Sequence, residues 1–447
     1  MEIAVKFGQF LLSLSLLIVL HELGHFIPAK IFKTKVEKFY LFFDAKFSLF
    51  KKKIGETVYG IGWLPLGGYV KIAGMIDESM DTETMKQEPQ PWEFRSKPAW
   101  QRLIIMLGGV TVNFILAFLI YIGMAYAYGD YYVKNSEVKD GVWVQNPVVE
   151  KAGILTGDKI LSIDNKKVDK FSSAIMSDLL MAKTVEIERN GTPQTITLPQ
   201  NFIGQFIDED KRNAISLRIP FAVRGLADDS KNKDILKAKD IVVELNGQPV
   251  KYFDQAPKIL EANKGKSIPG VVLRDNKRVP VQLNVNADGK LGAALGAVQE
   301  DNLERLGYYK FSRVSYGFFE SIPVGIDKGV EQLAGYGRQL KAIFTPSTGA
   351  AKGVGGFYAI FNIFPEEWSW QVFWAITAML SIVLGVMNLL PIPALDGGHV
   401  MFLLYEMISG RKPSDKFLER AQMVGFFLLI GLVLFANGND IYKLFFK

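Results

Sequence analysis

The sequence predicts a multi-pass α-helical membrane protein of about four spans, with a soluble region inserted between the second and third spans. The 447 residues have a mean hydropathy of +0.14 and are 49% hydrophobic, which is too apolar for a single soluble domain. They are also 22% charged, which is too polar for a chain made of spans alone. A span needs about 20 mostly apolar residues. Four segments approach this length: 3–26, 103–128, 370–390, and 424–434 with its flanks.

Lysine and arginine residues gather beside the predicted spans. They follow the first span and fill the loop between the last two: Lys30, Lys33, Lys35, Lys38, Lys51, Lys52, Lys53, Arg411, Lys412, Lys416 and Arg420. This is the positive-inside distribution, which places both loops in the cytoplasm and leaves the termini and the inserted region outside. Because the membrane flanks account for the net charge of +6, we expect no nucleic-acid partner. The chain has no cysteine, which excludes disulfides and thiolate zinc sites.

The first predicted span contains a metal-binding motif. His21, Glu22 and His25 form H-E-x-x-H after an uncharged apolar run. Positions i and i+4 share one helix face, so His21 and His25 could bind one Zn2+ ion, with Glu22 beside them as general base. Ionisable residues inside a span are costly and mark function. The segment lacks the small-residue cleavage site of a signal peptide, so we expect it to be retained.

A third zinc ligand has to come from another apolar segment, because catalytic zinc takes three protein ligands and leaves one position for water. The third span is followed by N-L-L-P-I-P-A-L-D-G-G, and its Asp396 is the sole carboxylate between Glu367 and Glu406. We expect Asp396 to be that ligand, since two histidines and one carboxylate form an established hydrolytic set. His399 is expected near the metal or at the membrane interface, but not as a ligand.

Residues around Asp396 are candidates for substrate binding. Pro391 and Pro393 break the helix and leave backbone groups unpaired, which at membrane depth must line a cavity or be buried in protein. A substrate strand could pair with them. Asn388 could donate to a developing oxyanion or join two helices, and the sequence favours neither role. Because a peptide bond inside a helix is closed to attack, the expected substrates are spans that contain helix-weakening residues.

Residues 35–71 are predicted to form hairpins between the first two spans. Three aromatic, strand-prone runs lie at 39–43, 47–50 and 58–64. Gly67 and Gly68 then mark a turn. The sheet could dip into the membrane if its backbone pairs with itself, and a small cytoplasmic sheet is the alternative. The acidic segment 77–90 is predicted to be a linker.

The inserted region contains an internal repeat. Residues 154–165 and 236–247 align without gaps, with Asp158 opposite Asp240, and predict two β-rich domains at 129–220 and 221–304. Both resemble PDZ domains of bacterial membrane proteases, although Lys239 replaces the glycine that usually precedes the aspartate. The resemblance implies that peptide C-termini could add a strand to a sheet edge. Spacer domains that only obstruct bulky substrates are the alternative.

The rest of the chain completes the predicted organisation. Residues 1–128 hold the first two spans, the zinc motif and the β-loop, and 367–447 hold the last two spans. Between the repeat and the third span, apolar residues of 306–344 recur every three or four positions. They predict amphipathic helices on the outer membrane surface, assigned to a domain at 305–366. A core helix of the second repeat domain is the alternative.

Together, H-E-x-x-H in a first span, N-x-x-P-x-P-x-L-D-G in a late one, and Gly67-Gly68-Tyr69 between them resemble the site-2 proteases over nearly the whole chain. The resemblance implies zinc-dependent cleavage of single-span proteins already trimmed on the outer side, such as an anti-sigma factor or signal peptide remnants. It also implies a bacterial inner-membrane protein with periplasmic PDZ-like domains and an active site toward the cytoplasm. The loop before Gly67, Gly68 and Tyr69 would be re-entrant and present an edge to substrate.

This chain departs from the family pattern at two places. The segment from Gly108 to Asn113 lacks the proline of the usual G-P-x-x-N, and Gly355-Gly356-Phe357 lacks the proline of the usual G-G-P. Neither departure touches the predicted ligands. A non-catalytic scaffold is disfavoured by the intact metal motifs, and a metal transporter by the presence of only three histidines.

Overall fold

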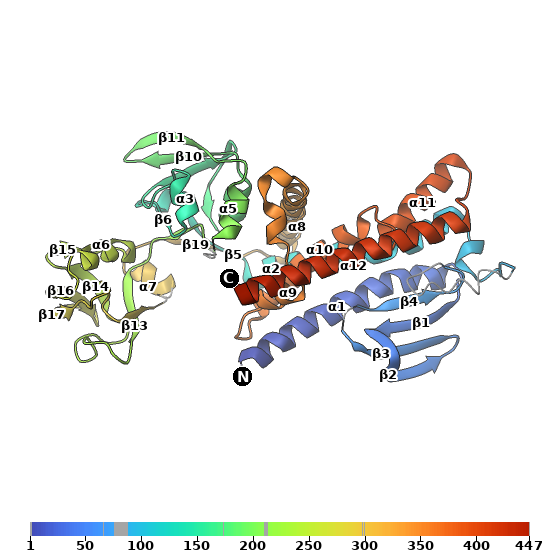
Figure 1. Ribbon diagram of the computed structural model, residues 1–447, viewed down its shortest axis with the longest axis horizontal. Helices are drawn as coiled ribbons and strands as arrows, with labels where there is room; N and C mark the ends of the chain where they lie inside the picture. The colour runs from blue at the N-terminus through green and yellow to red at the C-terminus, as the bar shows by residue number, and fades with distance from the viewer. Residues whose placement is uncertain are drawn as a thin grey trace. The chain divides into compact units, whose positions relative to one another are not determined.

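The computed structural model describes residues 2–65, 67–75, 88–172, 174–209, 213–296, 298 and 300–446. Most of the acidic segment predicted as a linker, residues 77–87, lies outside them. The chain divides into two compact units (Figure 1). The helical unit comprises Met1–Gly129, Ser315–Leu340 and Lys352–Lys447, and the repeat unit comprises Asp130–Val314 and Lys341–Ala351.

Four helices of the described residues are long and apolar enough to cross a membrane: α1 (Glu2–Ile31), α2 (Ala99–Tyr128), α10 (Trp370–Leu389) and α12 (Asp415–Phe446). They confirm the predicted number of spans and their positions. The last helix extends well beyond the predicted apolar run, because helix-compatible polar residues flank that run on both sides. Two shorter helices complete this part, α9 (Phe357–Asn362) and α11 (Asp396–Ser409).

α1 and α2 are in backbone contact where they cross. A Cβ added to Gly24 would overlap the carbonyl of Gly108, and one added to Gly108 would overlap the carbonyl of Gly24. Such close approach through small residues is a main source of helix association in membranes. The crossing lies within the H-E-x-x-H turn and therefore brings α2 directly against the candidate metal ligands.

The predicted hairpin region forms a four-stranded sheet in the order β2-β3-β1-β4. Its strands are β1 (Val36–Leu41), β2 (Phe43–Ile54), β3 (Thr57–Leu64) and β4 (Tyr69–Ile72). The three aromatic runs are strands, as predicted. β1 and β3 pair in parallel, whereas β2–β3 and β1–β4 are antiparallel. The segment after the glycine turn adds β4, which ends the strand order and so has one edge that no strand of the described residues covers.

The prediction of helix over 306–344 is wrong in its first part. Residues Phe311–Val314 form strand β19, which pairs antiparallel with β5 (Asp130–Lys134), and β9 (Lys170–Phe171) extends this sheet. The helix α8 runs over Phe318–Ile343. Its buried Gly325 and Gly329 pack on Ile122 and Phe118 of α2, so this helix belongs to the helical unit and is no core helix of the repeat. A strand prevails at 311–314 because β5 supplies a pairing partner that local periodicity does not reveal.

The repeat unit holds two modules with separate hydrophobic cores. The first module contains β6 (Val142–Val144), α3 (Pro147–Lys151), β7 (Lys159–Ile163), β8 (Lys166–Lys167), α4 (Ala174–Met181), β10 (Thr184–Arg189), β11 (Thr192–Thr197), α5 (Phe202–Asp208) and β12 (Ile215–Leu217). The second contains β13 (Phe221–Leu226), β14 (Ile241–Leu245), β15 (Gln248–Pro249), α6 (Ala256–Glu261), β16 (Ser267–Arg274), β17 (Lys277–Asn284), β18 (Ala293–Leu295) and α7 (Glu300–Arg305). The sheet orders are β11-β10-β7-β8, with β6 paired to β12, and β17-β16-β14-β13-β18.

The internal repeat predicted from the sequence is present in the two modules. Asp158 and Asp240 are each 1% exposed, and each accepts two hydrogen bonds of 2.6–2.8 Å from an arginine, Arg189 and Arg274 respectively. Bidentate pairs of this kind fix geometry as well as charge. Lys239 has a left-handed backbone with φ of +74°, like Gly157 with φ of +99° at the same position of the first repeat. The lysine therefore replaces glycine without a change in the turn.

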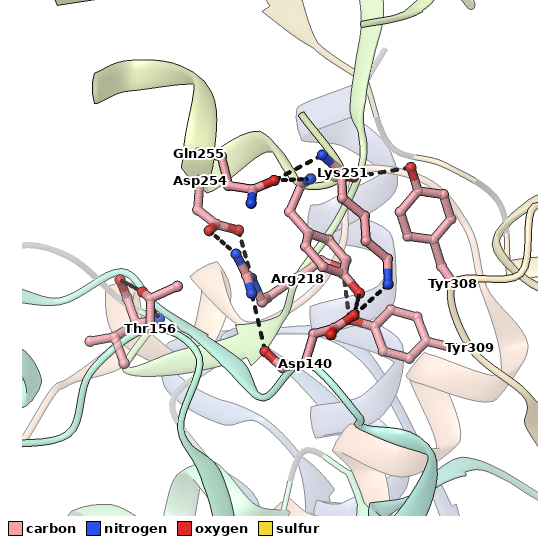
Figure 2. A network of polar contacts seen from close by, with 10 residues as sticks. Asp140, Thr156, Arg218, Lys251, Asp254, Gln255, Tyr308 and Tyr309 are labelled. Carbon is pink, nitrogen blue, oxygen red and sulfur yellow. Dashed lines mark hydrogen bonds and ion pairs between the residues drawn. The ribbon is translucent and has the colours of Figure 1, made fainter. Parts of the chain in front are cut away.

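A polar network joins the two modules (Figure 2). Arg218, between β12 and β13, donates to both carboxylate oxygens of Asp254 at 3.0 and 2.6 Å and to the carbonyl of Asp140 at 3.1 Å. Its guanidinium lies 4.3 Å from the ring centre of Tyr252, whose hydroxyl donates to the Asp140 carboxylate at 2.6 Å. Hydrogen bonds from Lys251 and Tyr252 hold the pKa of Asp140 below its usual value.

We predict that Arg218→Met loosens this junction. The change leaves Asp254, whose side chain is 8% exposed, without its cation. Loss of one partner of a buried ion pair costs about 3 kcal/mol, so hydrogen exchange over 215–226 in the full chain should accelerate about 100-fold. Arg278→Met is the control, because its pair with Glu244 is largely exposed and should contribute little. Equal protection in the two variants would contradict the prediction.

Candidate metal centre

Three candidate ligand atoms converge inside the helical unit. Nε2 of His21 lies 3.3 Å from Nε2 of His25, and these two nitrogens lie 3.4 and 3.3 Å from Oδ2 of Asp396. Bonds of 2.0–2.2 Å to a tetrahedral zinc ion place ligand atoms roughly 3.3–3.5 Å apart. The spacing therefore fits one zinc ion, and the three side chains form a possible metal-binding group.

The hydrogen bonds behind the histidines support this assignment. Nδ1 of His25 donates to the carbonyl of Ile105 at 2.8 Å, which leaves its Nε2 with a lone pair. Oδ2 of Asp396 is buried and has no hydrogen-bond partner among the described residues. If the ring proton of His21 is also on Nδ1, then Nε2 of both histidines and Oδ2 of Asp396 each direct a lone pair at the same point. A cation at that point would bind all three atoms.

Asn113 of α2 orients the other histidine. Its Nδ2 lies 3.0 Å from Nδ1 of His21, and its Oδ1 is buried with no hydrogen-bond partner in the part of the chain that the structure describes. The two orientations of an amide are nearly isosteric. Rotation of this amide gives the Nδ1–H of His21 an acceptor and removes the unpaired oxygen. Asn113 ends the Gly108–Asn113 motif in the sequence but is not among the predicted site residues.

A tight turn between α10 and α11 presents Asp396. Ala394 adopts φ of +79°, a left-handed conformation that costs about 1–2 kcal/mol for a residue with a Cβ. Its N–H donates to Oε1 of Gln422 in α12 at 3.2 Å. A Cβ on Gly397 or Gly398 would overlap backbone atoms of 389–393. These backbone contacts explain why glycines follow Asp396. The hydrogen bond from Ala394 to Gln422 of α12 stabilises the turn.

The glycine turn before β4 lies against Glu22. A Cβ on Gly68 would lie 2.5 Å from Cγ2 of Ile18 and 3.5 Å from Cγ of Glu22. The carboxylate of Glu22 also interacts with the backbone of Val70. These contacts place the candidate general base between the metal ligands and the free edge of the sheet.

A cavity of about 810 Å³ brings most predicted site residues together. It is lined by the candidate ligands and base and by four predicted substrate-binding residues: His21, Glu22, His25, Asp396, Asn388, Gly67, Gly68 and Tyr69. Nδ2 of Asn388 lies 3.4 Å from Nε2 of His21, and His399 lines the same cavity.

Pro391 and Pro393 are not brought to this cavity. The carbonyl of Pro393 packs on Gly425 of α12, so neighbouring protein covers this part of the backbone that we expected a substrate strand to satisfy, whereas Pro391 is exposed. The sequence could not show this packing, because it depends on how the last span folds back over the turn.

We predict that Gly109→Ala impairs zinc binding. A Cβ at this position of α2 would overlap Nε2 of His25 and lie 2.7 Å from Cε1 of His21, so the ligands would have to move. The zinc content of the purified protein at a fixed chelator concentration should fall at least about tenfold, as for other disturbed ligand shells. Gly123→Ala is the matched control, since a Cβ there meets no atom within 4 Å. Full zinc content in both variants would refute the packing argument.

Asn113→Leu should weaken zinc binding by about 10- to 100-fold, because the Nδ1–H of His21 loses its acceptor. Competition with a chelator measures the change. Ser13→Ala, which removes a buried hydrogen bond to Thr377 in the same helical unit, is expected to leave zinc affinity unchanged. If both variants bound zinc equally well, Asn113 would have no orienting role.

The chain is similar to known proteases over nearly its whole length. The family model for peptidase family M50 matches residues 9–432. The regulator of sigma-E protease RseP of Escherichia coli is 26% identical, and the regulator of sigma E protease of Haemophilus influenzae 27% identical, with 98% of each chain covered in both alignments. A Rickettsia conorii protein described as a zinc metalloprotease is 26% identical over 98% of each chain. The chain therefore belongs to peptidase family M50, the site-2 proteases, and is a zinc metalloendopeptidase.

Proposed function

We propose that this protease hydrolyses peptide bonds within the membrane spans of single-span proteins that have already been trimmed on the outer side. One observation carries the proposal: two candidate ligands and the candidate base lie on α1, a candidate span, and face a cavity bordered by an open sheet edge. A soluble substrate would not need chemistry at this depth.

His21, His25 and Asp396 would hold the zinc ion, which supplies Lewis acidity and lowers the pKa of bound water. Glu22 is close to these ligands but is not one of them, so its carboxylate can accept the proton of the attacking water and return it to the leaving amine. The Asn388 amide would donate to the carbonyl oxygen of the scissile bond as negative charge develops there.

The open edge of β4 is the proposed docking site for substrate. An extended segment can add to a sheet edge through backbone hydrogen bonds, and β4 ends the strand order beside Glu22. Gly67, Gly68 and Tyr69 would contact the substrate at the start of this strand. Because the substrate must leave its helix to pair in this way, spans with helix-weakening residues would be cleaved faster.

The surroundings of the site follow from the same proposal. The active site would lie toward the cytoplasmic side of a bacterial inner membrane, which the lysine-rich flanks favour, and the sheet β1–β4 would be a re-entrant element. The two modules of the repeat unit would be periplasmic PDZ-like domains that bind peptide C-termini or exclude bulky outer domains. The relatives named for sigma-E regulation favour an anti-sigma factor as substrate, and signal peptide remnants would satisfy the same size limit.

The test is cleavage of a doubly tagged single-span reporter with a short outer tail, in membranes. Glu22→Gln should keep its zinc but lower cleavage about 10²- to 10⁴-fold, the usual contribution of general acid–base catalysis. Asp396→Asn should lose both zinc and cleavage, because it removes a candidate ligand. Glu367→Gln, an exposed carboxylate before α10, is the control and should match wild type.

Two results would overturn the proposed function. One is a cut that maps outside the span of the reporter. The other is cleavage by Glu22→Gln at the wild-type rate, which would show that the base acts elsewhere. Full zinc content with full activity in Asp396→Asn would disprove the ligand assignment alone.

A further inference from the structure

Four polar side chains of the sheet line the cavity that holds the candidate metal centre, and three of them contact one another: Lys38 of β1, Asp44 of β2 and Tyr69 of β4. The fourth, Lys71 of β4, pairs with Glu37 at 3.7 Å. The Tyr69 hydroxyl donates to Oδ1 of Asp44 at 2.9 Å and accepts from Nζ of Lys38 at 3.4 Å. Nζ of Lys38 also lies 3.8 Å from Oδ2 of Asp44. We call Lys38, Asp44 and Tyr69 the polar triad. The proposed cleavage chemistry uses neither Lys38 nor Asp44.

Aromatic stacking holds the triad in place. The Tyr69 ring stacks between Tyr40, at 5.3 Å and 11°, and Phe43, at 6.0 Å and 10°. Tyr40 is itself buried, and its ring lies where a Cβ of Gly60 would be. The hydroxyl of Tyr69 is therefore fixed before any substrate arrives, as a specific binding site requires.

The charges of the triad select the kind of side chain that fits. One cation, one carboxylate and one hydroxyl give a neutral group, with the side chains of Lys38 and Asp44 still 41% and 24% exposed. The triad can therefore donate a hydrogen bond from Lys38 and accept one at the neighbouring carboxylate of Asp44. An amide or hydroxyl side chain complements both, whereas a charged side chain would compete with the existing ion pair. An apolar side chain would displace water from the remaining donor and acceptor positions of Lys38 and Asp44 without replacing its hydrogen bonds, which is a basis for discrimination.

Strand geometry limits which substrate residues reach the triad. Tyr40 pairs with Tyr69 and Phe39 with Val70, so Tyr40 and Tyr69 share one face of the sheet. The other face turns toward α1, where Phe39 packs on Phe26. Successive side chains of a strand point to opposite faces. A substrate strand on the edge of β4 would therefore direct every second side chain toward the triad and the others toward α1.

We propose that the polar triad is a specificity subsite for an asparagine, serine or threonine side chain of the substrate, at every second position of the strand that pairs with β4. This inference rests on the proposed function. These residue types also favour unwinding, because their side chains compete for backbone hydrogen bonds within a helix. One substrate residue would thus both weaken the span and be recognised once the span is extended.

The test is a set of reporters that carry either asparagine or the isosteric leucine at each of several successive positions around the scissile bond. For wild type, the ratio of kcat/KM between the asparagine and leucine reporters should alternate with position, by about tenfold, the effect of one good hydrogen bond. Tyr69→Phe keeps the stacked ring but removes the hydroxyl, and it should abolish the alternation. Asp44→Asn, which removes the charge alone, should reduce it.

Tyr59→Phe is the matched control. Tyr59 lies in the same sheet, packs on Phe26 of α1 and is not among the residues lining the cavity, so the alternation should persist. Cleavage without alternation in wild type, or alternation that survives in both Tyr69→Phe and Asp44→Asn, would overturn the subsite and leave the proposed function intact. Failure of wild type to cleave any reporter would overturn the proposed function and the subsite with it.

Discussion

The helical unit depends on the backbone contact between α1 and α2 at Gly24 and Gly108. Because the two backbones touch here, residues on one face of α2 contact the imidazoles of His21 and His25 directly. Ile105, Gly109 and Asn113 recur every four residues, so they lie along one helix face. The carbonyl of Ile105 accepts from Nδ1 of His25, the amide of Asn113 faces Nδ1 of His21 and can accept from it when rotated, and Gly109 leaves room for the rings. If the two helix axes lay farther apart, neither histidine ring would have its contact with α2.

Polar groups within this unit pair with one another across helices. Ser13 and Thr377 share a hydrogen bond of 2.9 Å between α1 and α10, and Ser381 donates to the carbonyl of Asn113. Arg102 of α2 binds Glu406 of α11 in a similar way. Lipid is as apolar as the helix surfaces, so burial of apolar side chains gives little driving force for helix association in a membrane. Close packing and interhelical hydrogen bonds therefore contribute much of the association free energy. The candidate metal centre therefore belongs to a wider set of paired polar groups.

The sheet contributes to the site through its last strand. The glycine turn at Gly68 rests on Glu22, while Tyr69 points to the opposite face and joins the polar triad. The period of two along a strand thus puts the candidate base on one face of the sheet and the polar triad, the proposed subsite, on the other. The ring of Phe43, which stacks on Tyr69, also lies against this turn, since a Cβ on Gly67 would be 3.0 Å from it.

The sequence by itself determined the spans, the strand-prone region, the repeat and the candidates His21, His25 and Asp396. Each depends on local composition, on the fixed spacing of a helix, or on the scarcity of carboxylates in apolar segments. Tertiary structure decided the rest. Asn113 and Gly109 reach the centre because two distant helices cross, and strand β19 replaces a predicted helix because β5 pairs with it. Pro393 packs on α12 instead of lining the cavity, and the triad assembles from three separate strands. Such contacts depend on how elements pack in space, which no local pattern of residues encodes.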